Sequence, residues 1–508
     1  MRSLRRTPAA LAAAAALLCV AVPAADAGTV LRVDGSEVTR AYDPSVPSNG
    51  AADMGRMPAG PAPKAGSAQK KKNKKKGPTK GEKAVDKALK SALKRRGISR
   101  RSERSYRKTY RLARSRRDRL RGQRRKELNY VVTTLEAIAL RRQLTASRMK
   151  PLFLIVQRNA QFWLRSPFPG SRGYVQFRGS QMLFEYYVGE GLQLQPLANF
   201  KKANSLHGAC VKPTAGVACN RAALAKLLDE MVATRVKRGK FTAWEYYFDF
   251  GGRPPWISGM ATATGIQAFG RAGQLLNTSK WRKYVRAAYP AFTTRAPTGV
   301  LARGPMGGNH YLQYSFASRL YIINAFLQSI IGLYDYAEIT GDPTAARLWR
   351  AAEPEARKEL PANDTGDWST YSYRGRESTR EYYDLLLEFT AGMCHRLKIE
   401  QYCTTTKNFR KYIAKPATLT FAGPATATKG QETQIRFNVD KLSAVQIVIT
   451  HENGKTSLNK TATFRRGAGS FTWKPGATGT YTVTLSAKEL RTGKGLRTRT
   501  EPAEIVSQ

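Results

Sequence analysis

Acidic residues are scarce in this sequence. Lysine and arginine total 86 against 36 aspartates and glutamates, which gives a formal net charge of +50 at pH 7. Such an excess favours polyanionic partners: acidic polysaccharides, anionic cell-wall polymers or membrane surfaces. The charge is concentrated, because 28 lysines and arginines but four acidic residues lie between Lys64 and Lys126. We interpret this tract by itself as a solvated tail.

Long apolar runs are also lacking, apart from one near the start. The first residues, MRSLRRTPAALAAAAALLCVAVPAADAGTV, combine a basic start, an apolar stretch from Ala9 to Val22 and the triplet Ala25-Asp26-Ala27. This pattern predicts a secretory signal peptide over residues 1–27, and the apolar stretch is short for a transmembrane helix. We therefore expect a secreted or cell-surface protein, for which nucleic acid is not an expected partner.

Cysteine is rare, with five residues in the chain. Four of them form two pairs with the same spacing of nine residues: Cys210 with Cys219, and Cys394 with Cys403. In an exported chain such pairs favour two local disulfides. A zinc site is the alternative, because His207 and His395 stand near the pairs, but the C-x2-C spacing of zinc ribbons is absent. With no nucleotide-binding loop either, we expect no metal and no cofactor.

Four stretches of different composition follow the signal peptide. Residues 28–80 are rich in Pro, Gly and Ala and contain KKKNKKK, which predicts a disordered linker. Residues 81–127 suit a charged helical segment that Gly97 interrupts. Residues 128–415 form the main domain, and residues 416–508 form a small one.

The main domain has the periodicity of a series of helices. Apolar residues recur at helical spacing in YVVTTLEAIALRRQL and PLFLIVQRNAQFWL, and again in seven later segments. One of these, ASRLYIINAFLQSIIGLYDYAEITGD, predicts a long helix that ends at Gly341, with Pro343 beyond it. Helix pairs with uneven loops suggest an α/α toroid or a helical solenoid, and the period of about 34 residues of tetratricopeptide repeats is absent.

After Lys415 the pattern changes to short alternating runs. TQIRFNV, AVQIVIT and GTYTVTLSA are examples, separated by Gly, Pro and the pair Asn453-Gly454. They predict an all-β sandwich of about 90 residues with an immunoglobulin-like arrangement. We assign no chemistry to it.

Tyrosine and arginine are crowded into one connection, PANDTGDWSTYSYRGRESTREYYD, from Pro361 to Asp384. A surface loop needs only small turn-forming residues, whereas tyrosine needs a partner for its hydroxyl. The sequence Asp364-Thr365-Gly366 occurs in aspartic proteases, but those enzymes need two such carboxylates on strand-rich lobes. The single copy here, in helical surroundings, argues against a protease.

Several separated stretches occur in an order typical of one family. FEYYVGEGLQLQPLANFKKAN and PPWISGMATATGIQA come first, and NAFLQSIIGLYDYAEITGD, ELPANDTGDWSTYSYR and REYYD follow. Together, over roughly residues 150–412, they resemble the C-terminal domain of D-glucuronyl C5-epimerases, which act on heparan-type and heparosan-type polysaccharides. The resemblance implies an α/α barrel.

The resemblance also implies a set of site residues. The implied catalytic residues are Tyr314, Tyr371, Tyr383 and Arg374, and the implied substrate-binding residues are Gln313, Trp256 and Tyr311. Gln313 departs from the family, which has an acid directly before the first tyrosine. We interpret the neighbouring tyrosines as core or groove residues: Tyr321, Tyr373 and Tyr382.

These residue types suit inversion at C5 of a uronic acid. Removal of the C5 proton puts negative charge on the adjacent carboxylate, which arginine binds in a bidentate manner. Tyrosines can exchange protons on both faces of the sugar. We therefore predict a polysaccharide uronyl C5-epimerase, an isomerase. The alternatives are a polysaccharide lyase or hydrolase on the same scaffold, and a non-catalytic binder of acidic glycans or cell wall.

Overall fold

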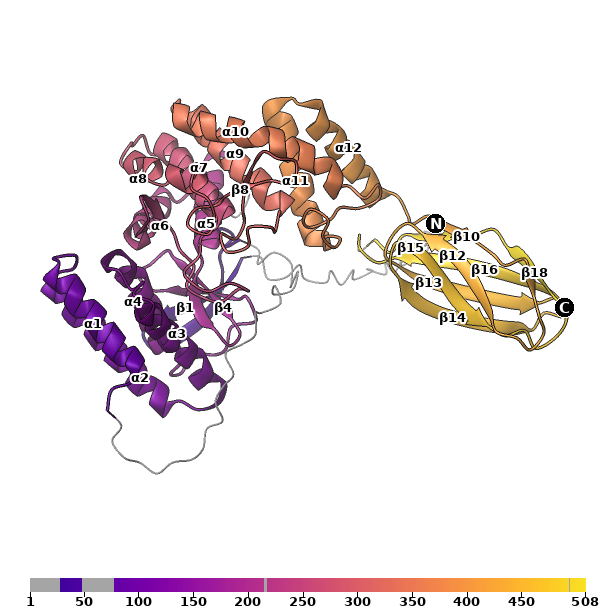
Figure 1. Ribbon diagram of the computed structural model, residues 1–508, viewed down its shortest axis with the longest axis horizontal. Helices are drawn as coiled ribbons and strands as arrows, with labels where there is room; N and C mark the ends of the chain where they lie inside the picture. The colour runs from indigo at the N-terminus through magenta and orange to yellow at the C-terminus, as the bar shows by residue number, and fades with distance from the viewer. Residues whose placement is uncertain (1–27, 48–76, 214–216, 493) are drawn as a thin grey trace, which may run out of the picture.

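The structure, a computed structural model, describes residues 28–47, 77–213, 217–492 and 494–508. Three parts follow one another along the chain: long helices with a small sheet, a larger helical part, and a β-rich part (Figure 1). The predicted signal peptide, residues 1–27, lies outside the described residues. Within them, no helix has the length and hydrophobicity needed to cross a membrane.

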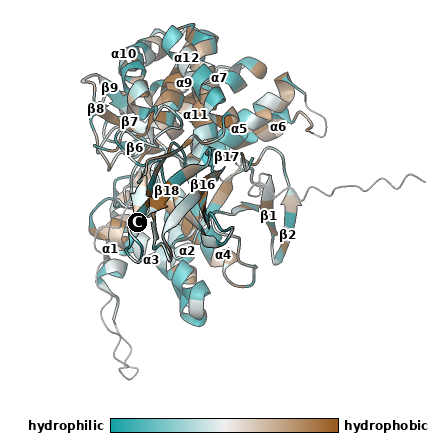
Figure 2. Ribbon diagram, turned by 90° about the vertical axis from the view of Figure 1, so that its right-hand side faces the viewer, coloured by the Kyte–Doolittle hydropathy of each residue, from teal (hydrophilic) through white to brown (hydrophobic). Residues whose placement is uncertain are grey.

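The basic tract forms part of a packed helical layer. The four helices are α1 (Lys80–Lys94), α2 (Arg100–Arg119), α3 (Gly122–Leu140) and α4 (Ala146–Phe162). α1 packs against α3, and α2 packs against α4. α1 buries Val85, Leu89 and Ala92 on one face, and even the strongly hydrophilic α2 (Figure 2) buries Tyr110 and Ala113.

The interpretation of the basic tract as a solvated tail is therefore wrong for residues 80–126. One apolar stripe anchors each helix, although its other faces carry cations. The predicted boundary between residues 127 and 128 is also wrong, because it falls inside α3, whose Glu127 and Leu128 are both fully buried.

A five-stranded sheet, in the order β2-β1-β3-β4-β5, lies against α3 and α4. Its strands are β1 (Thr29–Asp34), β2 (Glu37–Tyr42), β3 (Tyr174–Phe177), β4 (Leu183–Tyr187) and β5 (Gly191–Leu194). β1 runs parallel to β3, with Leu31 opposite Val175 and Val33 opposite Phe177. The predicted disordered linker is thus wrong for residues 29–42, because Leu31 and Val33 are buried in the main core. Residues 48–76 of that linker lie outside the described residues.

The larger helical part confirms the predicted helices. They are α5 (Pro196–Val211), α6 (Arg221–Thr234), α7 (Gly259–Leu275), α8 (Arg282–Arg286), α9 (Ile323–Thr340), α10 (Pro343–Glu359), α11 (Arg380–Leu397) and α12 (Glu400–Ala414). The short elements between them are the 3-10 turns η1 (Tyr289–Phe292) and η2 (Leu360–Asn363) and the hairpins of β6 (Val236–Arg238) with β7 (Phe241–Ala243), and of β8 (Leu301–Arg303) with β9 (Asn309–Tyr311).

α7 and α9 occupy the centre of this part. α7 lies between α5 and α9, and α9 also contacts α10 and α11. Most of their residues are buried, as expected for helices that are apolar on nearly all sides. A β-carbon on Gly332 of α9 would clash with the carbonyl oxygen of Ala263 of α7, so glycine is needed for this close approach. α9 ends at Gly341, with φ +65°, as predicted.

Both predicted cysteine pairs lie at bonding distance. The Cα atoms are 4.4 Å apart for Cys210 and Cys219, and 4.8 Å apart for Cys394 and Cys403. The second pair joins α11 to α12. Each bond closes a loop of about ten residues, which on the chain-entropy estimate stabilises the fold by roughly 2–3 kcal/mol. Among the described residues, no group of three or more His, Cys, Asp or Glu is placed to hold a metal ion.

The predicted β-rich region is confirmed. Its strands are β10 (Leu419–Phe421), β11 (Thr426–Ala427), β12 (Thr433–Val439), β13 (Ser443–His451), β14 (Thr456–Phe464), β15 (Gly467–Trp473), β16 (Gly479–Glu489), β17 (Arg497–Arg499) and β18 (Ala503–Ser507). They form two sheets, β10-β12-β15 and β11-β18-β16-β13-β14, with β17 beside β16. Alternate residues of both sheets, including Phe437, Val445 and Ile447, share one core.

Replacement of a core residue on α1 distinguishes a packed helix from a tail. We expect Leu89→Ala to lower the free energy of unfolding by about 2–5 kcal/mol, because Leu89 is 1% exposed and its loss leaves a cavity. Lys87→Ala, at an exposed position of the same helix, should change it by at most about 0.5 kcal/mol. Urea denaturation of both full-length variants provides the measurement. Equal stability of the two variants would mean that α1 is not part of the core.

Candidate active site

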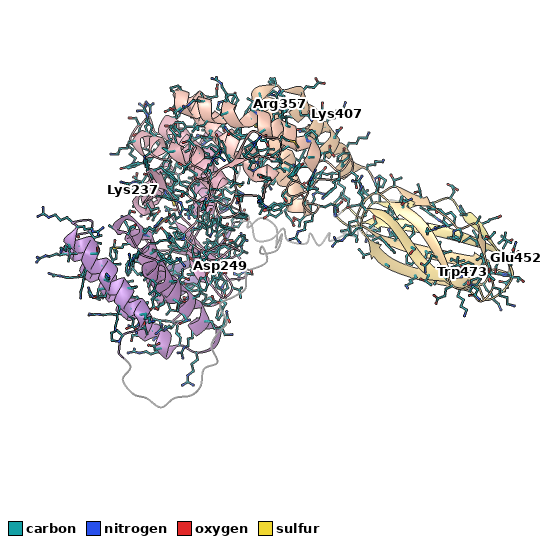
Figure 3. All side chains as sticks on the ribbon, viewed as in Figure 1. Lys237, Asp249, Arg357, Lys407, Glu452 and Trp473 are labelled. Carbon is teal, nitrogen blue, oxygen red and sulfur yellow. A yellow bond between two sulfur atoms is a disulfide. The ribbon has the colours of Figure 1, made fainter. Side chains whose placement is uncertain are left out.

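A pocket of about 140 Å³ lies where the sheet meets the larger helical part. One wall comes from β3, β4 and α5, and the other comes from the connections before α7 and α9 and from the start of α11. Asp249, labelled in Figure 3, marks the first of these connections, between the lining residues Phe248 and Phe250. The pocket collects charged and phenolic side chains: Arg172, Glu185, Lys201, Tyr314, Tyr371 and Tyr382.

A larger hollow, of about 710 Å³, lies between the β1–β2 hairpin and the ends of α5 and α6. Two of its charged residues, Arg178 and Asp34, are exposed and pair with each other at 2.6 Å. Clustered titratable groups in a buried setting identify a reactive site better than volume does. We therefore take the smaller pocket as the candidate active site.

Three tyrosines from separate segments meet in this pocket. Tyr314 precedes α9, Tyr371 follows η2, and Tyr382 lies in the first turn of α11. The rings of Tyr371 and Tyr382 meet edge to face, with centroids 4.8 Å apart. Tyr371 interacts electrostatically with both Tyr314 and Tyr382.

Burial raises the pKa of all three phenols above its ordinary value. For Tyr371 the neighbouring phenols Tyr314 and Tyr382 raise the pKa further. Arg172 acts in the opposite direction on the pKa of Tyr314 and Tyr382, because a nearby cation favours the phenolate. The net effect keeps the three phenols protonated at neutral pH.

Arg172 and Lys201 bring positive charge to the same pocket. The Nε of Arg172 is paired with Glu185, a carboxylate that is 1% exposed, and the guanidinium lies 5.0 Å from the ring centre of Tyr187. The backbone of Arg172 has φ +66°, a left-handed conformation that residues other than glycine seldom adopt. Burial lowers the pKa of Lys201. The lining residues thus include two basic side chains and the carboxylate of Glu185, and Glu388 also interacts with Lys201.

Aromatic rings form the remaining wall. Trp256 stacks on Tyr246 with centroids 4.0 Å apart, and its indole N–H donates to the carbonyl oxygen of Phe248 at 2.8 Å. The edge of Trp256 faces Tyr314, with centroids 5.6 Å apart. Gln313 also lines the pocket, and its side-chain oxygen accepts a hydrogen bond from Ser258 at 3.2 Å. Trp256 thus contributes a flat apolar surface, and Gln313 a neutral polar group.

Tyr383 lies in the core and not in the pocket. Its ring stacks on Trp368 at 3.9 Å, and its hydroxyl donates to the carbonyl oxygen of Phe409 at 2.7 Å. The side chain is fully buried. The adjacent Tyr382 reaches the pocket instead, because successive residues of a helix point about 100° apart. The structure therefore places Tyr382, and not the expected Tyr383, at the pocket.

Two further expected residues also lie away from the pocket. Arg374 is exposed, with its guanidinium 5.2 Å from the ring centre of the adjacent Tyr373. Tyr311 is buried, and its hydroxyl donates to the carbonyl oxygen of Leu348 at 2.8 Å. The structure thus gathers four of the seven expected residues, namely Tyr314, Tyr371, Gln313 and Trp256.

The cationic side of the pocket was not expected from the sequence. Arg172, Glu185 and Lys201 lie before and within the stretch FEYYVGEGLQLQPLANFKKAN. That stretch carried part of the family resemblance, so a signal was present. Nothing in its spacing showed which of its charged residues would face tyrosines more than 100 positions further along the chain.

Comparison with known proteins finds relatives for part of the chain. A family described as D-glucuronyl C5-epimerase C-terminus matches residues 238–412. A D-glucuronyl C5-epimerase of Caenorhabditis elegans is 31% identical over 134 residues, 24% of this chain and 22% of that protein. Both matches are to carbohydrate epimerases. Residues 238–412, about a third of the chain, are thus similar to the C-terminal part of D-glucuronyl C5-epimerases.

Other matches are more distant. An uncharacterised protein of Methanocaldococcus jannaschii is 23% identical over 152 residues, 28% of this chain and 49% of that protein. The chain thus spans half or less of the length of the curated relatives it matches. A sugar epimerase from a ruminal bacterium matches with TM-score 0.35 and 9% identity, over 52% of this chain and 70% of that chain. The Lin-41 filamin domain matches with TM-score 0.15 and 18% identity, over 18% of this chain and 91% of that one. Neither score is high enough to establish a shared fold.

The raised pKa of Tyr371 predicts how stability depends on pH. A phenol whose pKa is higher in the folded state contributes fully below the unfolded value of about 10 and loses that contribution as the pH rises above it. Above pH 10 we expect the wild type to lose about 1.4 kcal/mol of unfolding free energy per pH unit more than Tyr371→Phe. Urea denaturation at pH 9, 10 and 11 measures the difference. Parallel curves would mean that the Tyr371 hydroxyl is not buried.

Proposed function

We propose that the pocket inverts C5 of glucuronic-acid-type residues in an acidic polysaccharide. The observation that carries this proposal is the group of three phenols, Tyr314, Tyr371 and Tyr382, facing Arg172 and Lys201 across a pocket with aromatic walls. The match of residues 238–412 to the epimerase family supports it, because Tyr314, Tyr371 and Tyr382 lie in the matched segment. Arg172 and Lys201 lie outside that segment.

The reaction needs a site for the carboxylate and two proton-exchanging groups. In this proposal Arg172 and Lys201 bind the C6 carboxylate, on which negative charge accumulates when the C5 proton leaves. One phenol, ionised in the reactive state, takes that proton, and a second, neutral phenol gives its own proton to the opposite face of C5. Proton transfer through Tyr371, which interacts with both others, restores the first state.

The amide of Gln313 limits which groups of the pocket can exchange protons. A side-chain amide neither accepts nor releases a proton near neutral pH, so Gln313 takes no part in proton transfer. Its proposed role is to orient substrate or Tyr314, since the amide is held by Ser258. The proton chemistry then rests on the tyrosines alone, and the phenolate must form beside Arg172 because burial otherwise opposes it.

The architecture and location proposed for the whole chain fit this function. We propose that the larger helical part is an α/α barrel, that the β-rich part is immunoglobulin-like, and that the protein is exported to the cell surface or beyond.

A long acidic polymer also needs contacts outside the pocket. Exposed cations on α1 recur at helical spacing and form one basic face, which we propose binds such a polymer or an anionic wall polymer: Lys83, Lys87, Lys90 and Lys94.

Tyrosine variants test the epimerase proposal. Tyr371→Phe and Tyr382→Phe should each lower the rate of C5 proton exchange by about 10²-fold or more, the scale of a lost general acid or base. Arg172→Lys should also lower it, because an ammonium does not reproduce the planar guanidinium. The measurement is incorporation of deuterium at C5 of several uronic-acid polymers in heavy water, followed by nuclear magnetic resonance.

Tyr383→Phe is the matched control for Tyr382→Phe. It should keep wild-type exchange and lose about 1 kcal/mol of stability with its hydrogen bond to Phe409. Full activity of Tyr371→Phe and Tyr382→Phe would refute the proposed roles. Ultraviolet absorbance from an unsaturated product would instead indicate a lyase, and binding without any exchange would indicate a glycan-binding protein.

Charge reversal tests the basic face. The triple variant Lys83→Glu, Lys87→Glu and Lys94→Glu should bind a uronic-acid polymer roughly tenfold more weakly at low salt, and the difference should shrink at 1 M salt, where the Debye length is about 3 Å. A matched control makes the same charge change on the exposed side of α12 at Lys407, Arg410 and Lys411. Equal weakening of both variants would mean that net charge, and not the α1 face, governs binding.

A further inference from the structure

A segment that carries one of the three pocket tyrosines, Tyr371, contacts the β-rich part. Residues 369–378, named here the tyrosine ribbon, fold back on themselves. Thr370 lies opposite Glu377 in a β-bridge, and the backbone N–H of Tyr371 donates to the carbonyl oxygen of Arg376 at 2.9 Å. A second bridge joins Ser372 to Ile322, next to the start of α9. The position of Tyr371 therefore depends on how the ribbon is held at Glu377.

Arg491, just after β16, holds the ribbon at that point. Its guanidinium forms an ion pair with Glu377 and lies 5.4 Å from the ring centre of Trp368. The side chains of Arg491 and Glu377 are 13% and 22% exposed. Water screens such a pair less than it screens an exposed one, so the pair contributes more than a typical surface ion pair.

Two more contacts join the same two parts. Arg380, the first residue of α11, donates from Nη1 to the carbonyl oxygen of Thr492 at 2.8 Å. Arg466 pairs with the buried carboxylate of Asp367 at 3.2 Å. These contacts lie on both sides of Tyr371, and Arg380 stands two residues before Tyr382.

The β-rich part is itself organised to present Arg491. The buried carboxylate of Glu489 accepts hydrogen bonds from the backbone N–H groups of Arg491 and Thr492, the latter at 2.7 Å. The ammonium of Lys441 donates to the carbonyl oxygen of Tyr412 at 2.6 Å, near the end of α12. The β-rich part is thus attached both at α12 and at the tyrosine ribbon, and it lies beside α11 and α12 in Figure 1.

We propose that the β-rich part is a positioning element of the candidate active site: through Arg491 and Glu377 it holds the tyrosine ribbon, and with it Tyr371, in place. The catalytic consequence rests on the proposed epimerase function, whereas the ordering of the ribbon does not. Arg491 is a positioning residue, since its described contacts are with Glu377, Trp368 and Glu489 and not with the pocket.

A charge exchange in the full-length protein tests the proposal. The variants are Arg491→Glu, Glu377→Arg and the double variant with both changes, and Arg497→Ala is the control at an exposed position of the same sheet. The first measurement is amide hydrogen exchange of peptides that cover residues 369–378. The second is the kcat and KM of C5 deuterium incorporation.

We expect Arg491→Glu to speed amide exchange in the ribbon by about tenfold, equivalent to about 1.4 kcal/mol of local opening. It should lower kcat more than it raises KM, because the carboxylate site at Arg172 is untouched. The double variant should restore both quantities toward wild type, and Arg497→Ala should change neither.

Each contrary result has a distinct meaning. Unchanged ribbon exchange in Arg491→Glu, or no recovery in the double variant, overturns the proposal. Faster ribbon exchange with an unchanged kcat overturns the catalytic part of it. If the wild type incorporates no deuterium at C5, the proposed epimerase function fails, and the amide measurements alone decide whether the β-rich part orders the ribbon.

Discussion

The close packing of α7 against α9 is the constraint on which the site depends. Gly332 lets the two helices approach at Ala263, and the segments that lead into them are then forced together. The N–H of Gly259 donates to the carbonyl oxygen of Leu312, and that of Ser315 donates to the carbonyl oxygen of Ile257, both at 2.9 Å. These bonds bring Trp256 and Tyr314 to one wall of the pocket.

Burial has two opposing effects on the charged and phenolic side chains of the pocket. Burial among aromatic rings strengthens electrostatic interactions, but it also favours the neutral form of every titratable group. Arg172 keeps its charge there because Glu185 lies beside it, and Lys201 has its pKa lowered by the same burial. In the proposed function a uronate carboxylate binds Arg172 and Lys201, an interaction that a neutral sugar cannot make.

Elements that are local in sequence were predictable. The periodicity of α3 to α12, the stop of α9 at Gly341, the two cysteine pairs and the alternation of the β-rich strands follow from neighbours within a few residues of each other. Composition led to wrong predictions in two places. It predicts a solvated tail for the helices α1 and α2, because many charged residues surround their one apolar stripe, and it predicts a disordered linker for the strands β1 and β2. Composition averages over faces, whereas burial depends on one face.

The site shows the same division. The sequence by itself determined that a tyrosine-rich connection follows α10 and that Tyr314, Tyr371 and Trp256 belong to stretches shared with an epimerase family. Only the tertiary structure decided between Tyr382 and Tyr383, because the rotation of α11 about its axis is set by the packing of Tyr383 against Trp368 and Phe409. It likewise placed the guanidinium of Arg172, and not that of Arg374, in the pocket. A helix or a loop offers several side chains that could face a site. Which of them does so depends on packing against residues from distant parts of the chain, and the local sequence does not specify that packing.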